Sequence, residues 1–160
     1  IWLKYFKATT NLGIGGDRTQ NVLWRTERLT FSSSIKYAVI QCGVNNIDID
    51  PPIDIANGII TIALTIIRKK PGINVIITGL LPRDQYLTNR RQKINMVNHY
   101  LEKSCINQRN INFNKQSGWT HNNGNLINKY YYRDNLHLVE SGNEKLAASI
   151  VDSIKSSTSS

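Results

Sequence analysis

The residues whose types and spacing most clearly suggest a catalytic role lie in the segment Asp134-Asn135-Leu136-His137. A histidine that acts as general base in acyl transfer needs a carboxylate on its far ring nitrogen, which fixes the tautomer and stabilises the imidazolium. On a loop, residues three apart can fold back so that Asp134 meets the ring of His137. The alternative is a helix-entry loop with one solvated carboxylate and one ordinary histidine, and Asp-x-x-His alone does not decide between the two.

A second candidate is the segment Gly43-Val44-Asn45-Asn46, which closely follows a strongly apolar run. The side-chain amide of Asn45 in such a place can donate an N–H to an oxyanion that develops during ester cleavage. Glycine and asparagine are also common turn formers, so a plain turn explains the same letters.

A third candidate is the glycine-rich turn Gly13-Ile14-Gly15-Gly16-Asp17. It resembles a phosphate-binding loop, but the dinucleotide pattern Gly-x-Gly-x-x-Gly fails because position 18 is Arg18. What remains is a backbone N–H at a helix start, with Asp17 as a candidate cap, suited to an anion or an oxyanion.

Strands and helices alternate along the chain, which predicts βαβ units and a largely parallel sheet. Active sites in such sheets lie beyond the carboxyl ends of the strands, where the three candidate segments fall. Short apolar runs predict strands at Ala8–Leu12, Lys36–Gln41, Asn74–Thr78 and Ile111–Phe113. Helical spacing predicts helices at Thr19–Arg28, Ile53–Lys69 and Thr88–Lys103, and a last one from Ser141.

Length and composition indicate one globular domain. The chain has 160 residues, 40% of them hydrophobic, and a formal net charge of +9. We expect one domain over residues 1–155, followed by an unstructured polar tail at 156–160. No apolar run reaches the roughly 18 to 20 residues that span a bilayer.

The charge and the cysteines limit which partners and which cellular compartment are expected. The basic residues are dispersed, so nucleic acid is not favoured as a partner despite the charge of +9. Cys42 and Cys105 show no metal-ligand spacing and are expected to be reduced thiols, which favours a cytoplasmic protein. A homodimer is compatible with the sequence.

Four stretches are weak indicators singly but are informative when they are taken together and in order. They are Asn11–Arg25, the run into Gly43–Asn46, Thr78–Arg83 and Asp134–Leu138. Together they resemble blocks of the SGNH (GDSL-type) hydrolases, most closely the intracellular acetylhydrolases of that family. The resemblance implies a flavodoxin-like three-layer α/β/α sandwich with a mostly parallel sheet.

The same resemblance implies roles for four residues. Gly16 (backbone N–H) and Asn45 (side chain) would donate hydrogen bonds in an oxyanion hole, His137 would be the base, and Asp134 would orient it. It implies a serine esterase that cleaves small acyl esters, without a metal or an organic cofactor.

The family's Gly-Asp-Ser block, which carries the nucleophile, does not occur in this sequence. Ser32, Ser33 and Ser34 precede a predicted strand and would lie at the wrong end of the sheet. We therefore expect the first strand and the nucleophilic serine upstream of Ile1. The alternative is a catalytically inactive module on the same fold that binds RNA or a protein. The resemblance allows this, because some SGNH-like domains act with RNA and others are carried by retrotransposon proteins.

Overall fold

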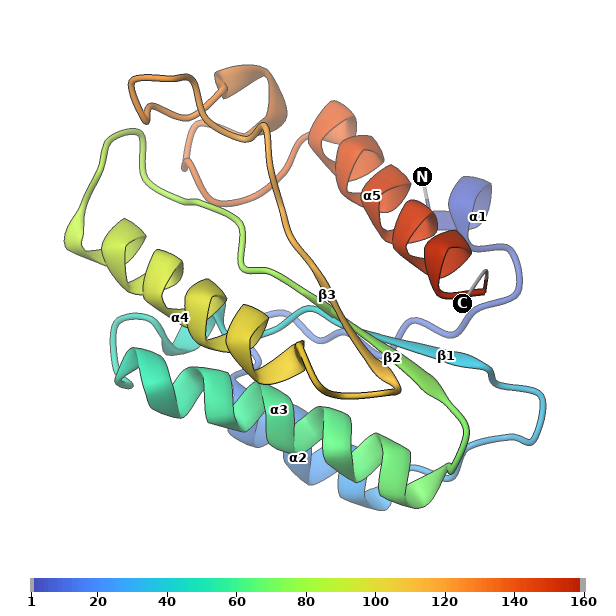
Figure 1. Cartoon of the computed structure of the whole chain (residues 1–160). Coiled ribbons are helices and arrows are strands. Elements are labelled where there is room, and N and C mark those ends of the chain that lie inside the picture. The colour runs from blue at the N-terminus through green and yellow to red at the C-terminus, as the bar shows by residue number, and fades with distance from the viewer. Residues whose placement is uncertain (1, 159–160) are drawn as a thin grey trace.

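The computed structural model describes residues 2–158 (Figure 1). Its strands are β1 (Tyr37–Ile40), β2 (Asn74–Thr78) and β3 (Ile111–Asn114). The α-helices are α1 (Trp2–Tyr5), α2 (Thr19–Arg28), α3 (Pro52–Lys69), α4 (Asn89–Cys105) and α5 (Glu140–Thr158), and the short 3-10 helices are η1 (Val44–Asn46) and η2 (Asn128–Tyr130). The predicted helices and three of the four predicted strands are present.

The three strands form one parallel sheet in the order β1-β2-β3. Ile77 of β2 is paired with Ile40 of β1 and with Phe113 of β3. Right-handed crossovers that step across a sheet in one direction put the connecting helices on one face. Accordingly α3 and α4 cover one face of the sheet, and α2 packs beside α3 (Figure 1).

Helix α5 covers the other face, with α1 packed against it, so the molecule has three layers (Figure 1). The predicted α/β/α sandwich is confirmed.

Each face of the sheet has its own apolar core. The larger core joins α3 and α4 to the sheet and contains Ile55, Ile59, Val75, Ile77, Ile94 and Val97, among others. The smaller core lies under α5 and contains Phe6, Trp119, Leu126, Tyr131, Leu146, Ala147 and Ile150. Two aromatic side chains that precede the Asp-His segment, Trp119 and Tyr131, are therefore core residues, whereas Tyr132 is exposed.

The strand predicted at Ala8–Leu12 is absent, and these residues form no regular structure. All residues from 7 to 16 are exposed, so no core holds an extended strand there. Polar side chains bond the local backbone instead: Thr9 Oγ1 donates to the Phe6 carbonyl, and Asn11 Oδ1 accepts from Gly13 N–H.

Two further details differ from the sequence expectations. Helix α5 continues through Thr158, so residues 156–158 of the expected tail are helical, while Ser159 and Ser160 lie outside the described residues. Helix α2 is capped at Arg18 and not at Asp17, whose carboxylate forms an ion pair with Arg25 instead.

Candidate active site

The segment with Asp134 and His137 is a tight loop between η2 and α5. An antiparallel bridge between Tyr131 and Leu138 closes its base. Asn135 lies in the left-handed region, with φ 55°. Such a backbone is uncommon for a residue other than glycine and is tolerated best by Asn and Asp. The loop therefore folds Asp134 back onto His137.

Asp134 and His137 form the side-chain hydrogen bond that their spacing predicts. His137 Nδ1 lies 2.6 Å from Asp134 Oδ2, and Asp134 Oδ1 accepts the backbone N–H groups of Leu136 and His137 at 3.0 Å each. The His137 bond and these backbone bonds lower the pKa of Asp134 to about 2. An ionised Asp134 favours the tautomer with hydrogen on Nδ1, which leaves Nε2 of the exposed ring as the basic nitrogen.

The side chain of Asn45 contacts Asp17, the residue that follows Gly16. Asn45 follows Gly43, whose φ of 110° turns the chain from β1 into η1. The exposed side chain of Asn45 donates from Nδ2 to the Asp17 carbonyl at 2.9 Å. Gly16, with φ 82°, immediately precedes Asp17 in the chain. The structure thus holds the Asn45 amide against the residue that follows Gly16, and their joint role as oxyanion donors stays a prediction.

The neighbouring Asn46 holds this region to α2. Its side chain is fully buried; Oδ1 accepts from Thr19 N–H at 3.1 Å, and Nδ2 donates to Asp50 Oδ2 at 2.6 Å. The two neighbouring asparagines therefore differ in role. The amide of Asn45 is exposed at the surface, whereas the buried amide of Asn46 stabilises the local structure.

The two halves of the candidate site are connected through the loop that follows β2. Asp84 N–H donates to the Asn135 carbonyl at 3.0 Å, and Asp84 Oδ1 lies 3.7 Å from Arg90 Nη1. Arg90 Nε in turn donates to Asp48 Oδ1, shortly after η1, at 2.5 Å. No hydrogen bond found among residues 2–158 joins His137 directly to Gly16 or Asn45, so their convergence on one cleft stays a prediction.

Sequence reasoning missed Asp84, Arg90 and Arg91 as parts of this region. Asp84, like Asn135, has a left-handed backbone (φ 63°), and the two residues bond each other. Arg91 is buried and donates to the carbonyls of Asp84 (3.0 Å) and Gly124 (2.5 Å). The motif Thr78–Arg83 ends directly before Asp84, and this adjacency in the sequence could have indicated that the loop belongs to the candidate site.

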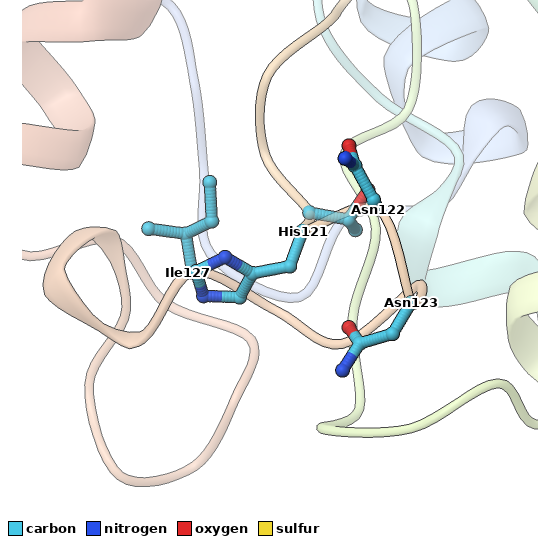
Figure 2. Close-up of a pocket in the computed structure, with 5 residues that line it drawn as sticks. His121, Asn122, Asn123 and Ile127 are labelled. Atoms are coloured by element: carbon cyan, nitrogen blue, oxygen red, sulfur yellow. The ribbon is translucent and has the colours of Figure 1, made fainter.

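Arg91 also fixes a hairpin that begins after β3. Its tip forms an open pocket of about 730 Å³, lined by Thr120, His121, Asn122, Asn123 and Ile127. Figure 2 shows the His121 ring directed toward Ile127. Four of the five lining residues have polar side chains, and none of the five is an Asp, Glu, Lys or Arg.

A second groove, of about 510 Å³, lies between the end of β1 and the start of the Asp-His loop. Gln41 follows β1 at one side, and Tyr132 marks the loop at the other. The remaining lining comes mainly from α5 and comprises Phe6, Glu140, Asn143, Leu146, Ala147 and Ile150.

The described residues hold neither a metal-site cluster nor a membrane-spanning helix. No cluster of three or more His, Cys, Asp or Glu in this part of the chain has the arrangement of a metal site. Within the same residues, every helix is too short or too polar to cross a bilayer.

Comparison with known sequences gives a consistent family. The model of the GDSL-like lipase/acylhydrolase family matches residues 3–145. The chain is 33% identical over 150 residues to platelet-activating factor acetylhydrolase IB subunit alpha2 of Homo sapiens, covering 91% of this chain and 65% of that protein. It is 32% identical over 146 residues to the human alpha1 subunit, covering 89% and 62%. The chain therefore spans less than two thirds of the length of these curated relatives.

Solved structures share the fold. A GDSL-like lipase from Bacteroides thetaiotaomicron superimposes with a TM-score of 0.79 at 24% identity, covering 97% of this chain and 80% of that one. A Streptococcus pneumonia protein described as a platelet activating factor gives 0.81 at 22% identity, covering 94% and 76%. With a family model that covers most of its length and relatives above 30% identity, the chain belongs to the GDSL-like lipase/acylhydrolase family, as its ordered motifs predict.

Proposed function

We propose that this chain forms the acid–base and oxyanion parts of a serine esterase for small acyl esters. The observation that carries the proposal is the 2.6 Å contact of His137 Nδ1 with Asp134 Oδ2, on a loop whose backbone also bonds the carboxylate. This arrangement supplies an oriented base with its second nitrogen exposed. The contact of Asn45 with the Asp17 carbonyl, beside Gly16, supports the oxyanion part.

In the first half of the reaction, the serine Oγ attacks the ester carbonyl while His137 Nε2 takes its proton. The carbonyl oxygen becomes an oxyanion, stabilised by the N–H of Gly16, the Nδ2–H of Asn45 and the serine's own N–H. The intermediate collapses, His137 returns the proton to the leaving alkoxide, and an alcohol departs. The acyl group stays on the serine.

In the second half, His137 removes a proton from water as the water oxygen attacks the acyl carbon. The same donors stabilise the second oxyanion. Collapse releases the carboxylic acid, and His137 returns the proton to serine Oγ. Asp134 remains ionised in both halves, and it orients the ring and stabilises the imidazolium.

The nucleophile is proposed to come from a Gly-Asp-Ser segment outside these 160 residues. The sequence contains no such block, and Ser32–Ser34 precede β1, at the opposite end of the strand from Gly43. The groove between Gln41 and Tyr132 supports the proposal, because it leaves room between the end of β1 and the loop that carries the base.

The acyl group is proposed to be small, such as acetyl. Two relatives at 32 to 33% identity are named acetylhydrolase subunits, which supports this choice over long acyl chains.

A fluorophosphonate probe tests the proposal, because it labels only an activated serine. The protein is prepared with the residues that precede Ile1 in its gene, and the adduct is located by mass spectrometry. We expect one adduct, on a serine upstream of Ile1, and we expect it to be lost in His137→Ala but retained in His99→Ala, a histidine on α4. An adduct on a serine within residues 1–160 would contradict the proposal, and no adduct would favour the inactive binding module.

A further inference from the structure

The turn that carries Gly16 has few restraints of its own. Three of the four residues from Gly13 to Gly16 are glycines, all four are exposed, and a side chain at Gly15 or Gly16 would meet no atom within 4 Å. One internal backbone bond, from Asp17 N–H to the Ile14 carbonyl, is long at 3.3 Å. Glycine has more backbone freedom than any other residue. The direction of the Gly16 N–H must therefore be set by contacts from outside the turn.

Arg25 makes these contacts from the last turn of α2. Its Nη2 donates to the Leu12 carbonyl at 3.3 Å, just before the glycines, and its Nη1 forms an ion pair with Asp17 Oδ2, just after them. One guanidinium thus bridges both ends of the turn. The side chains of Arg25 and Asp17 are only 25% and 16% exposed, so water screens this contact weakly.

Asp17 connects the same clamp to the second donor. Its carbonyl accepts Asn45 Nδ2 at 2.9 Å. A carbonyl oxygen can only accept a hydrogen bond, so the NH2 group of the Asn45 amide, and not its oxygen, faces Asp17. The second hydrogen on Nδ2 is left for another acceptor. A shift of Asp17 would therefore move both proposed oxyanion donors.

We propose that Arg25 is a positioning residue that holds the Gly16 N–H and the Asn45 amide in the geometry an oxyanion requires. This inference rests on the proposed function, because it assigns Arg25 a task in the same oxyanion hole. Arg25 itself does not touch the substrate.

The shape of the guanidinium explains why arginine suits this place. Its N–H donors form a rigid planar fork, so one side chain can hold a carbonyl and a carboxylate at the same time. A lysine ammonium keeps the charge but is a single point on a flexible stem. Arg25→Lys should therefore preserve the charge balance with Asp17 and lose the bridge to Leu12.

The first test uses nitrogen relaxation on the 160-residue chain and needs no catalysis. We expect the Gly16 backbone order parameter to fall from about 0.85 to below about 0.6 in Arg25→Lys, and the Asn45 side-chain amide to become more mobile. The matched control is Arg28→Lys, one turn later, which is exposed and stacks on Trp24 at 4.1 Å. Unchanged Gly16 and Asn45 signals in Arg25→Lys, or equal changes in the control, would overturn the inference.

A second variant covers the case in which Arg25→Lys does not fold. The double variant Asp17→Asn with Arg25→Gln removes both charges, so that neither is left shielded without its partner. It should show the same mobility at Gly16 while keeping the unfolding transition cooperative. A rigid Gly16 in this variant would contradict the clamp.

The catalytic test uses the protein with its upstream segment. Arg25→Lys should lower kcat about 10- to 100-fold, with KM and the pH profile almost unchanged, since the Asp134–His137 pair is not touched. A parent protein without hydrolysis would contradict the proposed function, while the relaxation measurement would still decide whether Arg25 holds the turn. An active parent with an unaffected kcat in Arg25→Lys would overturn the positioning role alone.

Discussion

At the scale of single residues, Asp134 orients the imidazole ring of His137 and favours the tautomer in which Nε2 is the basic nitrogen. Asp134→Asn removes the anionic acceptor while keeping the size of the side chain. The amide can favour the wrong tautomer of His137, so we expect kcat of the protein with its upstream segment to fall about 10²- to 10⁴-fold. A steady-state assay measures this, with Asp152→Asn, an exposed position on α5, as the control. Equal rates for the two variants would remove Asp134 from the mechanism.

The pH dependence of Asp134 follows from the same contact. The pKa of Asp134 is lowered from 3.8 to about 2, chiefly by the hydrogen bond with His137. A carboxyl with a depressed folded-state pKa stabilises the fold above its unfolded pKa and loses this contribution as pH falls through the folded value. The contribution should therefore disappear between about pH 4 and pH 2.

Carbon NMR of the Asp134 carboxyl measures that pKa directly. We expect a titration midpoint near 2, and in His137→Ala a midpoint displaced upward, because the largest cause of the shift is gone. A midpoint that is the same with and without the imidazole would contradict the contact.

Two adjacent glycines give a matched pair of variants. Gly16 has φ 82°, whereas Gly15 has an ordinary backbone, and neither has an atom within 4 Å of an added side chain. Gly16→Ala should cost about 1 to 2 kcal/mol because alanine is strained in the left-handed region, and Gly15→Ala should change stability by less than about 0.5 kcal/mol. Urea denaturation of both variants measures the difference, and equal costs would rule out the left-handed backbone at Gly16.

At the scale of elements, local sequence determined most of the secondary structure. Asn74–Thr78 was predicted with its observed bounds, because a short β-branched run between a Pro-Gly turn and a glycine leaves few alternatives. Helix α3 begins one residue before its predicted start, since Pro52 occupies a first-turn position. Patterns of this kind depend only on neighbouring residues.

Elements that depend on distant partners were harder to predict. A strand at Ala8–Leu12 needs a neighbouring strand to bond, and in the described residues this segment pairs with none of the three strands. The Asp84–Asn135 bond and the reach of Arg25 to Leu12 join segments that no periodicity relates. The Asp134–His137 contact was predictable because both residues share one short loop.

At the scale of the whole molecule, β1 is one of the two edge strands of the sheet, and β3 is the other. Within the described residues β1 pairs with β2 alone, and Val39 is 41% exposed on its surface. An upstream strand on this edge would satisfy free backbone groups, each of which costs about 1 to 3 kcal/mol when buried without a partner. We expect the protein with its upstream segment to unfold more cooperatively, and at a higher temperature, than the 160-residue chain.

Calorimetry of both proteins checks this expectation, and Val39→Lys sharpens it. The lysine should be tolerated in the 160-residue chain, where the position is open, and should lower Tm in the longer protein, where the added segment covers it. Identical melting of the two parent proteins would show that the upstream residues do not complete the sheet.

The central claim is that His137, Asp134, Gly16 and Asn45 act together with a serine from outside this chain. Hydrolysis of p-nitrophenyl acetate tests it most directly. We expect no catalysed hydrolysis by the 160-residue chain, clear turnover by the protein with its upstream Gly-Asp-Ser segment, and its loss when either that serine or His137 is changed to alanine. Turnover by the 160-residue chain that depends on His137, or turnover by the longer protein that survives His137→Ala, would contradict the account.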